Sequence, residues 1–204
     1  VNNQAFFGAV NGGTIKNIVL SGINVTAGVY ASGMAAYVDN SSTVIDSCKV
    51  SGYVKGGTPS AGFVGSLWNG TITNSSSNCY VEAQGGGVFA GINVGGTISD
   101  CYSYGEFASV SYSGNSTAMG GFIGDNSNGS TIERCFSSAD VSDHSNQYGG
   151  AAGGFAGGNS GSVIRNCYST GNLTSESGAV PYLGGFAASN INSASIYNSY
   201  STGT

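Results

Sequence analysis

The most reactive side chains in this 204-residue chain belong to five cysteines and a single histidine. Cys48, Cys101, Cys135 and Cys167 recur at matching points of the sequence, and Cys79 stands outside that pattern. Such cysteines can remain buried thiols, form disulfides or bind zinc. Because no C-x-x-C pair or group of histidines accompanies them, buried thiols are favoured. Disulfides stay open as the alternative, and we expect no metal site.

Catalytic chemistry has little support in the sequence. His144 lies in the segment SDHSNQYGG without a nucleophile beside it, which is typical of an exposed loop. The acidic pairs Asp140/Asp143 and Asp100/Glu106 do not recur as a cluster in neighbouring repeats. Because hydrolysis or cleavage of a polysaccharide needs positioned acids and bases, we expect no catalytic residue, no cofactor and no enzyme activity.

The composition favours a folded chain with few charges. Charged residues make up 7% of the sequence, whereas hydrophobic residues make up 40%, enough apolar surface to form a core. The net charge is −5 and only five residues are Lys or Arg, so a basic stripe for nucleic acid cannot form. No run of about 20 apolar residues occurs, and we expect no membrane span.

A degenerate repeat of seven units covers the chain. An isoleucine recurs at intervals of 26 to 34 residues, at Ile15, Ile45, Ile72, Ile98, Ile132, Ile164 and Ile196. The third residue after each isoleucine is Ile18, Cys48, Ser75, Cys101, Cys135, Cys167 or Ser199. The best-kept units read GGFIGDNSNGSTIERCFSSADV (120–141) and GGFAGGNSGSVIRNCYSTGNL (153–173). Four of the five cysteines are therefore members of one repeated column.

Alternation around this column predicts β-strands, and Gly and Asn between the strands predict corners with positive φ. One such coil cannot bury its inner face. Coils stacked about 4.8 Å apart can pair their backbones and align equivalent residues. The sequence therefore predicts an all-β fold: a right-handed parallel β-solenoid (β-helix) of about seven coils, without a capping helix. We expect residues 1–204 to form a single domain.

Stacking predicts ladders of equivalent side chains along the inside of the solenoid. One is aromatic and consists of Tyr37, Phe63, Phe89, Phe122, Phe155 and Phe186. The seven isoleucines form another, and Cys101, Cys135 and Cys167 stand on adjacent coils. These three are within disulfide reach by their Cα spacing, although parallel Cα–Cβ directions suit a ladder of thiols better. A corner column holds Asn17, Asn74, Asn166 and Asn198 with Ser47, Asp100 and Arg134, where stacked Asn side chains can hydrogen-bond.

The residue after the cysteine column is aromatic in four units, at Tyr102, Phe136, Tyr168 and Tyr200. Because the cysteine position points inward, alternation points these four side chains outward. We call them the outer aromatic stripe. Exposed aromatic stripes mark contact surfaces, which here could pack laterally or stack on carbohydrate. The alternative is that a loop or a bulge covers them.

The pattern G-G-F-x-G, followed by G-T-I-x-x-C-Y-S-x-G, resembles the GLUG repeat of bacterial surface proteins, which are similar to filamentous-haemagglutinin-type adhesins. The resemblance covers nearly the whole chain and implies an extracellular or cell-surface location. GLUG repeats also stand beside peptidase domains in large secreted proteins. No H-E-x-x-H motif occurs here, so the resemblance does not carry a peptidase activity to this chain.

The two ends of the repeat lead to an expectation about partners. The first unit begins close to its aromatic residue, the last stops just after Ser199, and no segment has the periodicity of a capping helix. We expect either covalent continuation of the array or end-to-end self-association. The leading hypothesis is a stiff extracellular rod, in a filament or in the stalk of a surface protein. The alternative is an adhesin that binds a glycan or host protein through the stripe or through variable loops near 108–119, 142–152 and 174–183.

Overall fold

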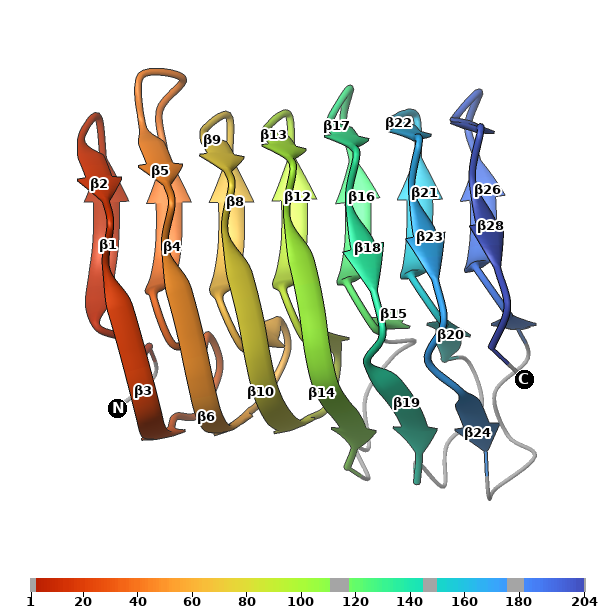
Figure 1. Ribbon diagram of the computed structural model, residues 1–204, viewed down its shortest axis with the longest axis horizontal. Coiled ribbons are helices and arrows are strands. Elements are labelled where there is room, and N and C mark those ends of the chain that lie inside the picture. Colours follow the sequence, from red (N-terminus) through yellow and green to blue (C-terminus); the bar gives the residue numbers. More distant parts are fainter. Residues whose placement is uncertain (1–2, 111–117, 145–149, 176–181, 204) are drawn as a thin grey trace.

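The computed structural model describes residues 3–110, 118–144, 150–175 and 182–203. Within these ranges all regular elements are β-strands, and each pairs in parallel with its counterpart in the next coil. In Figure 1 the chain rises along the back of the molecule, crosses the top, descends along the front and enters the next coil to the right. This path is a right-handed winding. The prediction of a right-handed parallel β-solenoid is therefore confirmed.

Four parallel sheets run along the stack (Figure 1). The back sheet holds β1 (Phe7–Asn11), β4 (Ala35–Asp39), β8 (Val64–Trp68), β12 (Ala90–Val94), β16 (Ile123–Ser127), β21 (Ala156–Ser160) and β26 (Ala187–Ile191). The upper sheet holds β2 (Thr14–Lys16), β5 (Val44–Asp46), β9 (Thr71–Thr73), β13 (Thr97–Ser99), β17 (Thr131–Glu133), β22 (Val163–Arg165) and β27 (Ser195–Tyr197). Seven strands in each of these two sheets correspond to seven coils.

The front sheet holds β3 (Val19–Thr26), β6 (Lys49–Gly56), β10 (Ser76–Ala83), β14 (Tyr102–Ser109), β18 (Phe136–Ser137), β19 (Asp140–Asp143), β23 (Tyr168–Ser169), β24 (Leu173–Ser175) and β28 (Tyr200–Ser201). The lower sheet holds β7 (Ser60–Ala61), β11 (Gly86–Gly87), β15 (Ala118–Gly120), β20 (Ala151–Gly153) and β25 (Tyr182–Gly184). The front strands of the first four coils are continuous for eight residues, and β18 and β19 divide the same path in two.

One column of left-handed residues makes the corner between the upper and front sheets. Its φ angles are all positive, between 49° and 57°, at Asn17, Ser47, Asn74, Asp100, Arg134, Asn166 and Asn198. Asn is the most frequent residue in this column because, with its short polar side chain, it adopts the left-handed conformation more readily than most other residues. The expected side-chain contact along the column occurs from Asn198 Nδ2 to Asn166 Oδ1 at 3.2 Å. At the middle of the stack, Arg134 instead donates two hydrogen bonds to Asp100, both of 2.8 Å.

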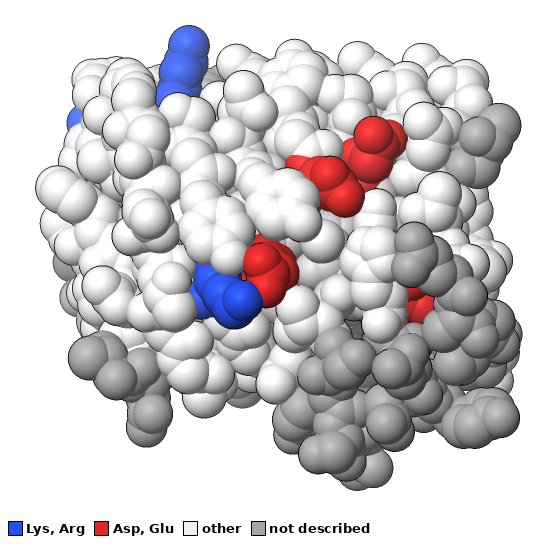
Figure 2. Space-filling model, turned by 90° about the horizontal axis from the view of Figure 1, so that it is seen from below, with Lys and Arg blue, Asp and Glu red and all other residues white. Residues whose placement is uncertain are grey.

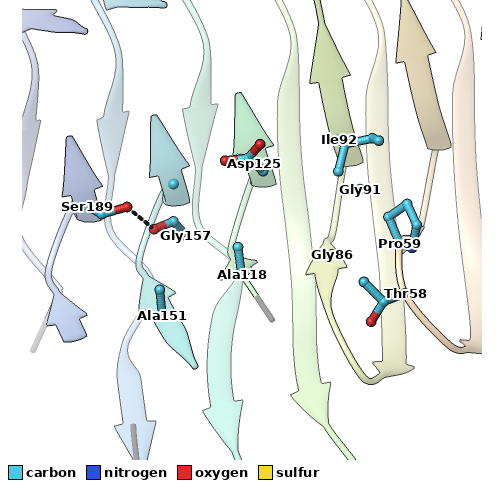
Figure 3. A pocket seen from close by; sticks show the side chains of 11 residues that line it. Thr58, Pro59, Gly86, Gly91, Ile92, Ala118, Asp125, Ala151, Gly157 and Ser189 are labelled. Carbon is cyan, nitrogen blue, oxygen red and sulfur yellow. Dashed lines mark hydrogen bonds between the residues drawn. The ribbon is translucent and has the colours of Figure 1, made fainter. Parts of the chain in front are cut away.

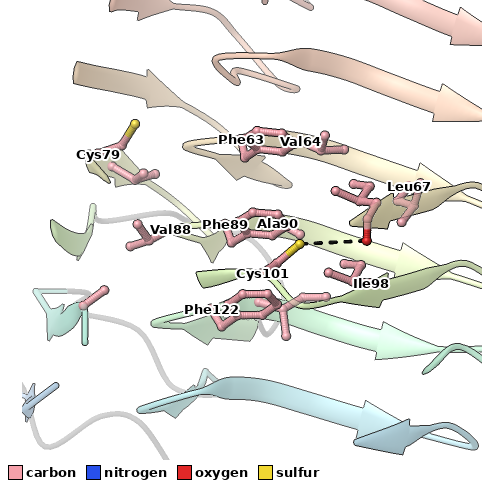
Figure 4. Close-up of a cluster of buried hydrophobic side chains, with 14 of the residues drawn as sticks. Phe63, Val64, Leu67, Cys79, Val88, Phe89, Ala90, Ile98, Cys101 and Phe122 are labelled. Atoms are coloured by element: carbon pink, nitrogen blue, oxygen red, sulfur yellow. Dashed lines mark hydrogen bonds between the residues drawn. The ribbon is translucent and has the colours of Figure 1, made fainter. Parts of the chain in front are cut away.

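The predicted isoleucine ladder lies in the upper sheet, where its seven members stand in register from Ile15 to Ile196. The phenylalanine ladder lies at the bend between the lower and back sheets. Phe122 stacks on Phe89 and Phe155 with ring-centroid separations of 4.7 and 4.8 Å and interplanar angles of 6° and 5°. Figure 4 shows three of these rings lying one above another in the core. The separations equal the spacing between coils, so ring stacking and backbone pairing are satisfied together.

Tyr37 does not belong to the aromatic ladder, and that part of the prediction was wrong. It lies in β4, pairs in register with Ser66 and is half-buried. The ladder position of this coil is Met34, which is fully buried and whose backbone N–H donates to the Phe63 carbonyl at 2.9 Å. Backbone pairing sets the register of a parallel sheet. Here it aligns the glycines that precede the ladder residue in neighbouring coils. The segment S-G-M of one coil therefore aligns with A-G-F of the next.

A ladder of asparagines, which sequence reasoning missed, lies inside the core along the back sheet. Nδ2 of Asn93 donates to Oδ1 of Asn126, Asn126 donates to Asn159, and Asn159 donates to Asn190, at 3.0, 2.9 and 2.8 Å. Asn93, Asn126 and Asn159 are fully buried. Leu67 occupies this column in the preceding coil. The repeated amide bonds let polar residues occupy the core because an amide can donate to one neighbour and accept from the other. At the start of the ladder, where Leu67 precedes it, the buried Asn93 Oδ1 has no hydrogen-bond partner among the described residues.

Candidate binding surfaces

Cysteines of the repeated column lie next to the corner in four of the seven coils. Each thiol of Cys48, Cys101, Cys135 and Cys167 lies 3.1 to 3.3 Å from the carbonyl oxygen of the residue two positions earlier. Figure 4 shows Cys101 inside the core, where its Sγ also lies 3.8 Å from the Ile72 carbonyl oxygen. Serines of the same column make the equivalent bond, from Ser75 Oγ to the Thr73 carbonyl at 2.7 Å. Cys and Ser can replace each other in this column because both are small donors that satisfy a corner carbonyl.

All five cysteines are free thiols and buried. Burial raises the pKa of the Cys48, Cys79 and Cys135 thiols, which keeps them protonated. The pKa of the Cys167 thiol is also raised, by hydrogen bonding to Cys135 and by burial. A protonated and buried thiol is a poor nucleophile. The geometry therefore gives this column a structural role as hydrogen-bond donors, and Cys79 lies in register between Gly52 and Gly105 on the front sheet.

The acidic residues considered for catalysis are separated or already engaged. Asp140 is exposed, whereas Asp143 is buried and accepts hydrogen bonds from Ser109 Oγ at 2.8 Å and Ser175 Oγ at 3.0 Å. The exposed His144 donates its backbone N–H to the same Ser109 hydroxyl at 2.8 Å. Asp143 thus ties three consecutive coils together, a role that the sequence did not indicate.

Asp100 and Glu106 also lie apart, because Asp100 occupies the corner and Glu106 the middle of β14. The register instead places Glu106 beside Asp140, where Glu106 accepts a bond from Ser142 Oγ at 2.9 Å. Asp140 accepts the Asn172 backbone N–H at 2.7 Å. Over the described ranges, no group of three or more His, Cys, Asp or Glu side chains is arranged to hold a metal ion.

The outer aromatic stripe forms a continuous stack on the front sheet. Tyr102, Phe136, Tyr168 and Tyr200 pair in register, and consecutive ring centroids are 5.1, 5.0 and 5.3 Å apart. Their interplanar angles of 3° to 11° mean that the rings lie face to face. Tyr104 adds edge-on contacts to Tyr102 and Phe136. The first three rings are half-buried and Tyr200 is 56% exposed.

This arrangement limits what the stripe can bind. Carbohydrate stacking needs the face of an aromatic ring, and along the stripe the faces are covered by neighbouring rings. The edges of the rings are the part of the stripe left for a ligand to contact. The stripe therefore stabilises the stacking of coils from outside, as the phenylalanine ladder does from inside. A ligand would contact the edges of its rings.

Charges on the exterior are few and mostly paired. On the face in Figure 2, Lys, Arg, Asp and Glu form small separate groups, and no basic band crosses its described part. Arg134 contacts Asp100 and Glu133, each at 2.8 Å, and Arg165 extends the same network to Glu133. Such exposed pairs contribute little to stability, because water and salt screen the charges. Within the described part of the chain, no helix is long and apolar enough to span a bilayer.

Several carboxyl groups have shifted pKa values. A hydrogen bond from Asn74 lowers the pKa of the Asp46 carboxyl, and hydrogen bonds from Arg134 lower the pKa of Asp100. Burial acts in the opposite direction on Asp125 and raises its pKa. A lowered pKa stabilises the fold above the unfolded pKa of about 4, and this stabilisation is lost as pH falls through the folded-state pKa. The raised pKa of Asp125 makes a destabilising contribution at neutral pH that acid relieves.

We expect the free energy of unfolding to fall on acidification below about pH 4, because the groups with lowered pKa outnumber Asp125. Urea unfolding followed by circular dichroism between neutral pH and about pH 2 measures this slope. Arg134→Gln, which removes the donors to Asp100, is the matched variant and should flatten it. A stability that stays constant or rises over this interval would contradict the assignment.

A groove of about 350 Å³ lies outside the solenoid, in the angle between the lower and back sheets. Figure 3 shows residues from several consecutive coils along it, among them Pro59, Ile92, Ala118, Asp125, Ala151 and Ser189. Asp125 is the charged residue among those that line it. The groove itself had no signal in the sequence, because residues from several coils that are far apart along the chain line it.

The GLUG motif matches residues 148–174 and 180–204, the last two units of the repeat. In both units the ladder phenylalanine, the upper-sheet isoleucine and the corner Cys or Ser take the same places as in the earlier coils. Residues 148–174 and 180–204 therefore carry the GLUG motif. The GLUG pattern thus describes one solenoid coil, with its glycines at the bend beside the phenylalanine ladder.

The solenoid is similar to the crystal structure of a candidate immunoglobulin A1 protease from Bacteroides ovatus. The TM-score is 0.71 at 19% sequence identity, over 98% of this chain and 63% of that chain. At this identity the likeness concerns the fold. The present chain spans less than two thirds of that protein's length. No curated protein sequence matches the chain.

Proposed function

We propose that these GLUG-type repeats form a stiff, non-catalytic rod in an extracellular or cell-surface protein. The observation that carries the proposal is the unbroken register of the isoleucine ladder through all seven coils. Each coil is hydrogen-bonded to its neighbours in several sheets, so bending the rod would break many backbone bonds at once. A rod of this kind spaces or supports other parts of a surface protein.

Large side chains exposed on the last described coil support a second part of the proposal, in which another coil packs against them. These exposed side chains include Tyr182, Leu183, Ile191, Tyr197 and Tyr200, which are 43% to 61% exposed. Equivalent columns in the middle of the stack are covered by the next coil. The covering coil can come from the same polypeptide or from a second copy stacked end to end, and end-to-end stacking would produce a filament.

Small-angle X-ray scattering and electron microscopy of the purified chain at increasing concentration test this proposal. The expected particle is a rod of constant cross-section that lengthens by about 34 Å per added copy, seven coils of about 4.8 Å. Ile191→Lys should stop the lengthening, and Tyr104→Lys on the lateral face is the matched control. A flexible or compact particle, or growth that only the lateral variant stops, would contradict the rod.

An adhesin is the second candidate, favoured by the rim of aromatic edges along the outer stripe. Aromatic residues are enriched where proteins meet, so a host protein suits this rim better than a sugar stacked on it. The variable loops of that hypothesis lie partly outside the described residues. Tyr102→Ser should abolish attachment to host cells in this case, and attachment that survives the change would eliminate the stripe as the adhesive surface.

A further inference from the structure

The outer groove exists because two sheets approach each other too closely for side chains. A Cβ atom on Gly124 of the back sheet would lie 2.9 Å from the Gly86 Cα of the lower sheet, and one on Gly157 would lie 2.5 Å from the Met119 nitrogen. Ala118 and Ala151 continue this floor on the lower sheet. The lining residues belong to five consecutive coils, so the groove is about 20 Å long and runs parallel to the solenoid axis.

Asp125 is placed so that its carboxylate can reach a ligand in the groove. It stands on the outer face of β16, between Ile92 of the preceding coil and Gly158 of the next. A Cβ atom on Gly158 would lie 2.6 Å from Asp125 Oδ1, so glycine leaves space beside the carboxylate. Ser127 supplies one hydrogen bond to it. An ionised carboxylate has about four acceptor positions, so most of them remain for a ligand.

On the outer face of the back sheet, the surface beyond Asp125 is apolar, and it ends at an aromatic residue. Ile92 and Pro59 line the groove itself. Trp68 lies on the same outer face and donates its indole N–H to Ser66 Oγ at 2.8 Å. Ser66 is the in-register neighbour of Ile92, so this bond holds the indole beside the apolar end of the groove. The indole is 38% exposed.

We propose that the groove binds a neutral saccharide chain lying along the solenoid axis. Asp125 accepts hydrogen bonds from its hydroxyl groups, and Ile92, Pro59 and Trp68 contact the apolar faces of its sugar rings. Carboxylates are strong acceptors for such hydroxyls, and aromatic rings with a free face suit the C–H side of a sugar. This site lies on the side of the solenoid opposite to the outer aromatic stripe and does not depend on the rod being part of a filament.

Two other ligand classes fit the groove less well. An anionic polysaccharide would meet Asp125 without any Lys or Arg among the described residues that line the groove. A peptide strand needs a free sheet edge to pair with, and the groove presents a face whose backbone groups are used between coils. A basic peptide could still pair with Asp125, and the experiment separates that case.

The test uses an array of short neutral oligosaccharides from β-glucan, xylan, mannan and chitin, followed by calorimetry and NMR on the whole chain. Ala151→Tyr should block the groove, and the lower sheet accommodates this size because Tyr182 stands in the same column. Asp125→Asn should weaken binding about tenfold or more, the usual effect of losing a charge-assisted bond. Tyr80→Ser on the front sheet, outside the groove and the stripe, is the matched control and should leave affinity unchanged.

Binding of a neutral glycan that Ala151→Tyr removes, with amide shifts centred on Ile92, Asp125 and Ala151, is the expected result. The amide shifts in the unsubstituted chain locate the ligand even if a variant folds poorly. Silence across the array, binding that Ala151→Tyr leaves intact, or binding of a lysine-rich peptide alone would each overturn the proposal. The rod is measured by scattering, so either proposal can fail without the other.

Discussion

Phe122→Ala is expected to lower the free energy of unfolding by about 3–5 kcal/mol, the usual cost of deleting a buried phenylalanine ring. The Phe122 side chain is fully buried and stacks on a ring above and a ring below, at 4.7 and 4.8 Å. Removing it therefore leaves a cavity and two uncovered ring faces. Rigid pairing of the backbone on both sides prevents the coils from collapsing into that space. Urea unfolding followed by circular dichroism measures the loss.

Phe186→Ala is the matched control. Phe186 occupies the same ladder, but it is only partly buried and stacks on Phe155 alone among the described residues. Its replacement should cost clearly less than that of Phe122. Equal losses at the two positions, or a loss below about 1 kcal/mol at Phe122, would mean that the phenylalanine ladder does not hold the coils together.

Asn126→Asp is expected to destabilise the fold by about 3–5 kcal/mol at neutral pH, the cost of an uncompensated buried charge. Asn126 is fully buried, accepts a bond from Asn93 and donates one to Asn159. The new carboxylate keeps the shape of the amide but cannot donate. It would therefore face the Asn159 Oδ1 oxygen at the place where the Nδ2 donor stood.

The penalty should depend on pH in a defined direction. Burial raises the pKa of the introduced carboxyl above its unfolded value of about 3.9, so the penalty exists at neutral pH and is relieved as pH falls through the raised value. The protonated form can donate to Asn159 as the amide did. The difference in unfolding free energy between the variant and the natural chain, measured in urea at several pH values, should shrink on acidification.

Asn126→Leu separates charge from packing at the same position. Leu67 fills this column in coil three, so the volume fits, and the main cost is the Asn159 Oδ1 oxygen left without its donor. We expect about 1–3 kcal/mol for this variant, independent of pH over the acidic range. A Leu variant as unstable as the Asp variant at neutral pH, or a difference that does not change with pH, would refute the role of the buried charge.

These ladders also support the proposed role of the chain as a stiff rod. Phenylalanine, isoleucine and asparagine columns all repeat at the spacing of the coils, and the outer stripe adds a fourth set of stacked groups. Each column resists sliding of one coil over the next, because a shift would break contacts in all of them together. Binding at the outer groove needs no movement of this framework.

The repeat and the stacking of coils could be predicted from the amino-acid sequence alone. The isoleucine recurrence, the column of Cys and Ser and the Asn-rich corner predicted a stack of about seven coils. They did so because a solenoid repeats the same local requirements in every coil. A left-handed corner favours Asn, as at Asn74 and Asn166, and a small donor must follow it, as at Ser75 and Cys167. Requirements of this kind act within a few residues and leave a direct trace in the sequence.

The tertiary structure alone decided the features that depend on which coils and sheets meet. Register assigned the aromatic column of coil two to Met34 and moved Tyr37 to the outside. Stacking turned the rings of the outer stripe toward each other, which covers the faces that a sugar would need. The approach of the lower and back sheets created the groove beside Asp125. Each of these results arises from contacts between residues that are distant along the chain, so no local pattern could predict them.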